Sequence, residues 1–93
     1  MQGQWEVIMQ GKKYLYSFRL SGTVIYRSPD DPGGIAGEGT WDAREDGVHV
    51  SWPKTGTVEF FPAPLNTNNQ PAESITKWGG TFKMQARKVN PYP

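Results

Sequence analysis

The sequence contains no cysteine and a single histidine, His49, among its 93 residues. Without cysteine there is no disulfide, no thiolate metal site and no cysteine nucleophile. One histidine on its own also argues against a zinc site, because such sites take several nitrogen or sulfur ligands. We therefore expect neither a metal nor a cofactor.

Long apolar runs and an excess of charge are missing as well. No apolar stretch approaches the roughly 20 residues of a membrane-spanning helix, and residues 1–13 lack the basic start and apolar run of a signal peptide. The formal net charge is +1, with acids and bases interspersed, so there is no broad field for nucleic acid or an anionic membrane. We expect a chain made in the cytoplasm, exported only by another carrier, that neither inserts into membranes nor binds nucleic acid.

What the sequence does contain is regular turn punctuation. Glycine followed by threonine and an apolar residue occurs four times, and the first three glycines stand at positions 22, 39 and 56. The two gaps of 17 residues are about the length of one hairpin. Residues 37–41, GEGTW, belong to this series. They lack the following helix and further glycines of a phosphate loop, so we interpret them as the start of a strand.

Between these marks, apolar residues alternate with a period of two, which is typical of half-buried strands. Turns are expected at Gln10-Gly11, at Ser21-Gly22 and at Asp46-Gly47, where a short hairpin needs positive φ. The alternating faces are Trp5, Val7 and Met9; Tyr14, Tyr16, Phe18 and Leu20; Val24 and Tyr26; Val48, Val50 and Trp52; Val58 and Phe60; and Phe82, Met84 and Ala86.

Residues 62–80 interrupt this pattern. Three prolines and three asparagines there argue against a central strand, and residues 72–78 allow one short helical turn at most. We therefore predict a single all-β domain over residues 1–93 with a long loop at about 62–80. Its seven or eight strands form an antiparallel meander in a small closed or nearly closed barrel, because closure removes exposed edges.

The residues that could carry catalysis do not assemble into a recognisable motif. His49 lies between Val48 and Val50, so it points away from the face that carries Trp52. There is no Gly-x-Ser-x-Gly nucleophile elbow. The acidic cluster at 42–46 stands beside a turn, where such side chains normally make local hydrogen bonds. We expect no catalytic residue and no enzymatic activity.

The aromatic residues are the best candidates for recognition. Trp5, Trp41 and Trp52 lie on predicted strands, whereas Trp78 ends the polar loop and is the tryptophan expected to be exposed. Exposed Trp and Tyr anchor protein contacts or stack on ligands. Trp78 can equally close the mouth of a small barrel, and both interpretations stay open. The candidate ligand- or partner-binding residues are therefore Trp78, Tyr26, Trp41 and Trp52.

Five motifs together resemble the small lipocalin-like barrels of bacterial proteins. The resemblance implies an up-and-down antiparallel barrel with a binding or accessory role rather than an enzymatic one. Some domains of this kind are similar to parts of secretion effectors or phage-like injection systems, which implies an adaptor, immunity or accessory protein. The motifs are G-x-W-x-V at 3–7, Y-x-F-x-L-x-G-T-V at 16–24, G-x-G-T-W at 37–41, D-G-V-x-V-x-W at 46–52 and T-V-E-F at 57–60.

Two functions follow as hypotheses. The first is a non-enzymatic barrel that binds another protein or a second copy of itself. The alternative is a binder of a small ligand or saccharide at the barrel mouth, lined by Tyr26, Trp41 and Trp52. We expect its pocket to be small or shallow, because the side chains of a barrel this narrow nearly fill the interior.

Overall fold

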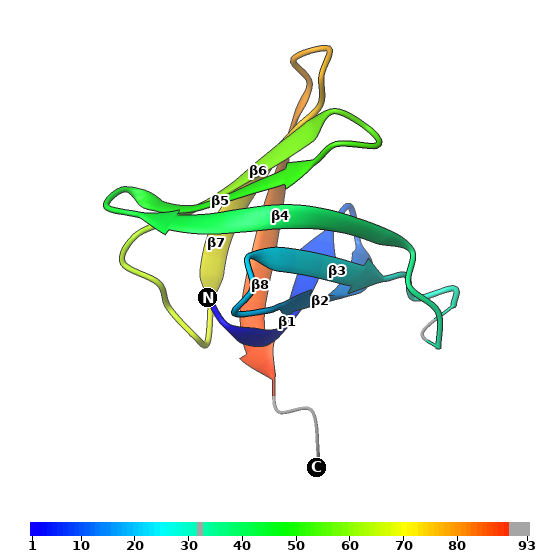
Figure 1. Ribbon diagram of the computed structural model, residues 1–93, viewed down its shortest axis with the longest axis horizontal. Coiled ribbons are helices and arrows are strands. Elements are labelled where there is room, and N and C mark those ends of the chain that lie inside the picture. The colour runs from blue at the N-terminus through cyan, green and yellow to red at the C-terminus, as the bar shows by residue number, and fades with distance from the viewer. Residues whose placement is uncertain (32, 90–93) are drawn as a thin grey trace.

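The computed structural model describes residues 1–31 and 33–89, and these form one closed antiparallel barrel (Figure 1). Each strand pairs with the next along the chain, and β1 also pairs with β8, which closes the barrel. The predicted all-β meander is confirmed, with eight strands. Within the described ranges, no helix is long and apolar enough to span a membrane. The strands are β1 (Gly3–Met9), β2 (Lys12–Phe18), β3 (Thr23–Arg27), β4 (Gly37–Arg44), β5 (Gly47–Trp52), β6 (Thr57–Pro62), β7 (Gln70–Ile75) and β8 (Thr81–Val89).

The turn between β1 and β2 is the one that the sequence predicts. Met9 pairs with Lys12, which leaves Gln10 and Gly11 as a two-residue loop. Both loop residues have positive φ, 53° and 77°. This is the primed turn that matches the twist of adjacent strands.

The turn between β4 and β5 lies one residue earlier than predicted. Arg44 pairs with Gly47, so the two loop residues are Glu45 and Asp46 rather than Asp46 and Gly47. Gly47 has a φ of 142°, and a Cβ there would overlap the backbone carbonyl of Phe61. Glycine is required at this position because β6 passes so close.

The predicted loop at 62–80 is wrong in its centre, where residues 70–75 form β7. Pro71 is tolerated in this strand because the ladder between β6 and β7 covers only residues 73–75 of β7. At Pro71 the strand pairs with β8 alone, opposite Gln85, so no partner on the other side needs the missing N–H. The irregular segments are therefore 63–69 and 76–80.

Strand β6 is turned the other way from the prediction. Its apolar residues Val58 and Phe60 were expected to face the interior, but the alternate residues do so. Val58 is 46% exposed and Phe60 half-buried, whereas Glu59 and Phe61 are buried. The register explains this, since Glu59 pairs with inward-facing Val50. Leu20 is a second error: it is 79% exposed, because β2 has already ended. Phe82 is a third error: it was predicted to be inward with Met84 and Ala86, but its side chain is exposed.

One end of the barrel is packed. Met1 lies against the core there, and its carbonyl accepts a hydrogen bond from the Trp5 indole at 3.1 Å. The indole of Trp41 donates to the backbone carbonyl of Arg19 at 2.8 Å and packs edge-on against Phe18. These contacts fill the end that holds the β2–β3, β4–β5 and β6–β7 connections. The other end, with the remaining four connections, is open.

Candidate functional site: a cavity at the open end of the barrel

A cavity of about 510 Å³ occupies the open end of the barrel. This volume falls within the range of small-molecule sites and exceeds the shallow pocket that the sequence predicts. Strands β2, β3 and β5 contribute an aromatic wall and β6 contributes a carboxyl group. The aromatic wall consists of Tyr14, Tyr16, Tyr26 and Trp52, and the carboxyl group belongs to Glu59.

The aromatic rings meet at steep angles. Tyr14 and Tyr26 have centroids 5.9 Å apart and planes at 74°. Trp52 stands edge-to-face to Tyr16, at 5.5 Å and 83°, and to Tyr26, at 5.3 Å and 81°. These edge-to-face contacts are the favourable ones for aromatic quadrupoles. Tyr16 and Tyr26 are 6.1 Å apart and tilted at 43°, so the four rings form one contiguous cluster without parallel stacking.

Two glycines of β4 give these rings their space. A Cβ at Gly37 would overlap the ring of Tyr26, and one at Gly39 would overlap the backbone carbonyl of Ser51 and lie 2.7 Å from Cε3 of Trp52. The residues 37–41 do begin a strand, as predicted. The structure adds a reason for the Gly-x-Gly pattern, because bare backbone lets the two rings lie against β4.

Glu59 lies at the base of the cavity and is 4% exposed. Its Oε1 accepts a hydrogen bond from the Tyr16 hydroxyl at 2.8 Å. Burial raises the pKa of the Glu59 carboxyl above its ordinary value, because an ion loses its hydration there. The indole of Trp52 and the hydroxyls of Tyr16 and Ser74 act in the opposite direction and only partly offset burial.

The polar groups around Glu59 are donors. The buried Nε1 of Trp52 makes no hydrogen bond of standard geometry, yet it is near enough to the Glu59 carboxyl to lower its pKa. The pKa of Tyr16 is raised well above its ordinary value, by burial first and by the charge of Glu59 second. The Tyr16 phenol therefore stays protonated at neutral pH and donates to the carboxyl.

The structure brings together only two of the residues predicted to bind a ligand. Tyr26 and Trp52 line the cavity. Trp41 does not, because it packs against Phe18 toward the closed end. Trp78 lies in the β7–β8 turn and is 84% exposed, with Lys77 Nζ 4.6 Å from its ring centroid.

Sequence reasoning missed Glu59 as a site residue, along with Tyr14 and Tyr16. The two tyrosines carried a signal, because they alternate on the apolar face of β2. The sequence signal for Glu59 is weak. Thr57, Glu59 and Phe61 alternate along β6, but they indicate an inward face only if a carboxyl group can lie in the interior.

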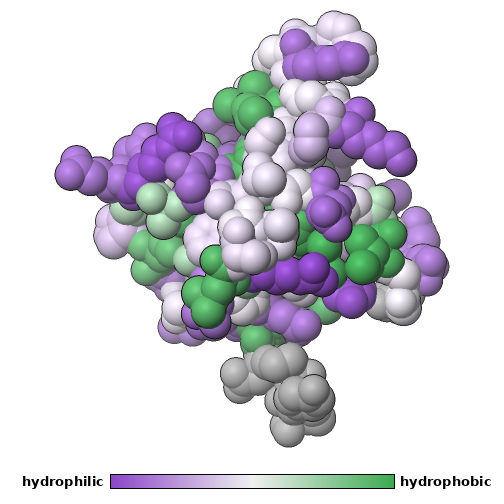
Figure 2. Space-filling model, in the orientation of Figure 1, coloured by the Kyte–Doolittle hydropathy of each residue, from purple (hydrophilic) through white to green (hydrophobic). Residues whose placement is uncertain are grey.

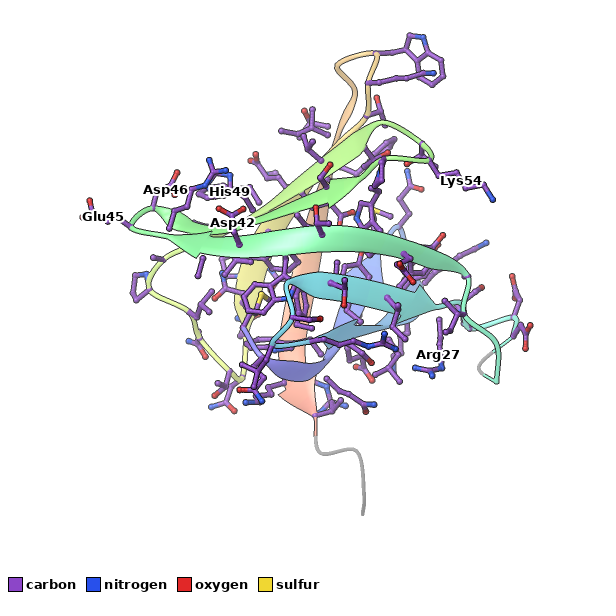
Figure 3. All side chains as sticks on the ribbon, in the orientation of Figure 1. Arg27, Asp42, Glu45, Asp46, His49 and Lys54 are labelled. Atoms are coloured by element: carbon purple, nitrogen blue, oxygen red, sulfur yellow. The ribbon has the colours of Figure 1, made fainter. Side chains whose placement is uncertain are left out.

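A second cluster lies on the outer surface, at the β4–β5 hairpin (Figure 3). Nε2 of His49 is 2.8 Å from Oδ1 of Asp46, and Nε of Arg44 is 2.7 Å from Oδ2 of Asp42. The hydrogen bond from His49 is the main cause of the lowered pKa of Asp46. His49 points away from the interior, as predicted, and its ring lies 4.9 Å from that of Phe60.

This surface cluster lacks the parts of a catalytic site. Among the hydrogen bonds of the described residues, none joins His49 to a serine or threonine hydroxyl, as a nucleophilic triad requires. The same part of the chain contains no group of three or more His, Cys, Asp or Glu that could hold a metal ion. The cluster has the geometry of a paired surface turn.

Comparisons with protein-family models, with curated proteins and with solved structures find no match for this chain. The barrel is established by its strand pairing. Two features of the molecule are candidates for binding: the cavity at the open end and the exposed turn that carries Trp78.

Proposed function

We propose that the protein binds a small organic ligand in the cavity at the open end of its barrel. The observation that carries this proposal is a volume of about 510 Å³ with a buried carboxyl group, Glu59, at its base. Eight-stranded barrels are wide enough to hold one small ligand at one end, as lipocalins and streptavidin do. The lipocalin-like character implied by the sequence motifs is part of this proposal.

The distribution of polarity supports binding over a purely structural role. The closed end is filled by apolar and aromatic side chains whose indole N–H groups reach backbone carbonyls. The open end holds an acid that loses hydration and gains one hydroxyl donor. A buried group of this kind destabilises a fold unless it is paired, so its presence favours a role in recognition.

A fluorescence titration tests this proposal, because Trp52 lines the cavity. The probes are choline, glucose, biotin and laurate, each titrated into the wild type. At least one should change the emission in a saturable way. Trp52→Phe should remove the change, whereas Trp41→Phe, a matched variant at the closed end, should keep it. No saturable change with any probe, or a change that survives Trp52→Phe, contradicts the proposal.

A protein contact centred on Trp78 is the second candidate function. An indole that is 84% exposed is unusual, and Lys77 stacks over it at the tip of a hairpin. Exposed Trp of this kind often anchors a protein interface. On the face shown in Figure 2, apolar residues form separate green patches among hydrophilic ones rather than one continuous surface. This face therefore offers a small contact rather than a large apolar interface (Figure 2).

Light scattering after size-exclusion chromatography tests this candidate for a second copy of the chain. The wild type should associate as concentration rises, and Trp78→Ala should stay monomeric. A wild type that is monomeric throughout contradicts self-association through this residue. The link to bacterial secretion or injection systems stays a prediction of the resemblance.

A further inference from the structure

The cavity combines four aromatic walls with one buried acid. The faces of aromatic rings carry negative potential, which attracts a cation placed over them. Here three pairs among the rings of Tyr14, Tyr16, Tyr26 and Trp52 meet edge-to-face at 74° to 83°, and Tyr16 and Tyr26 are tilted at 43°. The four rings contact one another and also line the cavity, so an occupant would lie against aromatic surface.

Glu59 has no positive partner among the described residues. The groups that influence its ionisation are two hydroxyls and an indole, with no lysine or arginine among them. Lys54 and Glu38 lie at the rim of the cavity, where both are exposed and carry charges of opposite sign. An ionised carboxylate with no counter-charge is costly at such depth, and a bound cation would supply the missing charge.

We infer that this cavity takes a small organic cation of the alkylammonium class, with its charged head against the aromatic lining and near the Glu59 carboxylate. The inference rests on the proposed function and names the class of ligand for the same site. A neutral apolar ligand would leave the carboxylate unpaired. A saccharide would use the hydroxyl groups of the lining but would also leave the charge of the carboxylate unpaired.

A pair of probes with the same shape and different charge provides the test. Choline carries a quaternary nitrogen where 3,3-dimethyl-1-butanol has a carbon atom. Both are titrated into the wild type, followed by Trp emission and by nuclear magnetic resonance, with sodium chloride as a control for ionic strength. We expect choline to bind at least tenfold more tightly than the neutral alcohol.

Two variants distinguish the effect of the Glu59 carboxylate on choline binding from the effect of the protein's net charge. Glu59→Gln keeps the shape of the side chain and should weaken choline binding at least tenfold while leaving the alcohol unchanged. Glu73→Gln removes the same charge from an exposed position on the neighbouring strand β7. It should leave the affinity of both probes unchanged, because an exposed charge is screened by solvent and salt.

The possible outcomes are distinct. Equal affinities of choline and the alcohol in the wild type overturn the cation inference and leave ligand binding at this site intact. Equal weakening of choline binding by Glu59→Gln and Glu73→Gln also overturns it, since the effect would then be a general field. If neither probe binds, the cation inference fails. If glucose, biotin and laurate fail as well, the proposed function fails with it.

Discussion

Glu59 is the residue whose position conflicts most with a barrel built only for stability. It is inward on β6, between Thr57 and Phe61, and its one hydrogen bond of standard geometry comes from Tyr16. Replacing buried polar groups with apolar ones of similar shape is often neutral or stabilising. An acid at this depth is therefore expected to have a use that outweighs its cost.

The raised pKa of Glu59 predicts a specific dependence of stability on pH. The folded protein keeps this proton to a higher pH than the unfolded chain, whose pKa stays near 4.5. The stability that Glu59 contributes is thus fully present below that value and is lost as the pH rises through the folded-state pKa. Glu59→Gln does not titrate, so the variant should gain on the wild type by about 1.4 kcal/mol for each pH unit crossed between the two pKa values.

Urea unfolding of both proteins from pH 4 to pH 8 measures this difference. Glu73→Gln serves as the control, because its side chain is exposed, and its stability should follow the wild type across the range. A wild type that gains on Glu59→Gln as the pH rises would show that the carboxylate is better stabilised in the fold than in water.

Gly37 is the second residue on which the cavity depends. The added methyl group of Gly37→Ala would overlap the ring of Tyr26, so either the ring or β4 must move. We expect a loss of roughly 1–3 kcal/mol in the free energy of unfolding, together with weaker ligand binding. Gly33→Ala is the matched control, because the nearest atom to its Cβ, on Asp31, is 4.0 Å away. Equal stability of the two variants would contradict the close contact with Tyr26.

Individual residues differ in how far the sequence predicted them. Tyr26 and Trp52 were identified because aromatic residues on alternating strand positions point to one face. Glu59 was not, because the period-two rule assigns the apolar residues Val58 and Phe60 to the interior. Pairing with β5 decides the face instead, and that register depends on the whole barrel.

Among the strands, β7 is the one that its own residue pattern indicates least clearly. It is held by Gln70, which is fully buried. The Gln70 amide donates to the carbonyls of Pro62 at 3.0 Å and Pro71 at 2.8 Å, and its oxygen accepts the N–H of Asn66 at 2.7 Å. One side chain thus ties the start of β7 to the end of β6 and to the loop between them.

Gln70→Ala should therefore destabilise the protein by roughly 2–4 kcal/mol, since it leaves a space in the interior and three part-buried backbone groups without their partners. Chemical denaturation measures the loss, and amide exchange should show that β7 is the strand most affected. Gln85→Ala removes an exposed glutamine from the adjacent strand β8 and should change stability by less than about 0.5 kcal/mol. Equal losses in the two variants would contradict the anchoring role of Gln70.

The error at β7 has a physical cause. Proline and asparagine argue against a central strand, and residues 63–69 are indeed irregular. Within 70–75, however, Pro71 stands where only one neighbouring strand pairs. The period-two pattern of Ala72 and Ser74 is too weakly apolar to indicate burial, although both are buried.

The whole molecule is a closed barrel with two unlike ends. Closure joins β1 to β8 over residues 4–9 and 84–89, so each of the eight strands in the described residues pairs on both sides. Met1 and the indoles of Trp5 and Trp41 fill one end, while the other encloses the cavity. The closed meander could be predicted from alternation and turn residues alone. The difference between the two ends could not be predicted, because it depends on which side chains from distant strands lie at the same height along the barrel axis.

The four indole N–H groups allow the most direct test of ligand binding at the open end. Trp5 and Trp41 donate to backbone carbonyls at the closed end, Trp78 is exposed, and Trp52 lines the cavity. In a ¹H–¹⁵N spectrum titrated with choline, the Trp52 indole signal should shift in a saturable way while the other three stay in place. A Trp52 signal that does not move with choline, or a shift confined to Trp78, would contradict binding of a cation in the cavity, and the same result with glucose, biotin and laurate would contradict ligand binding there.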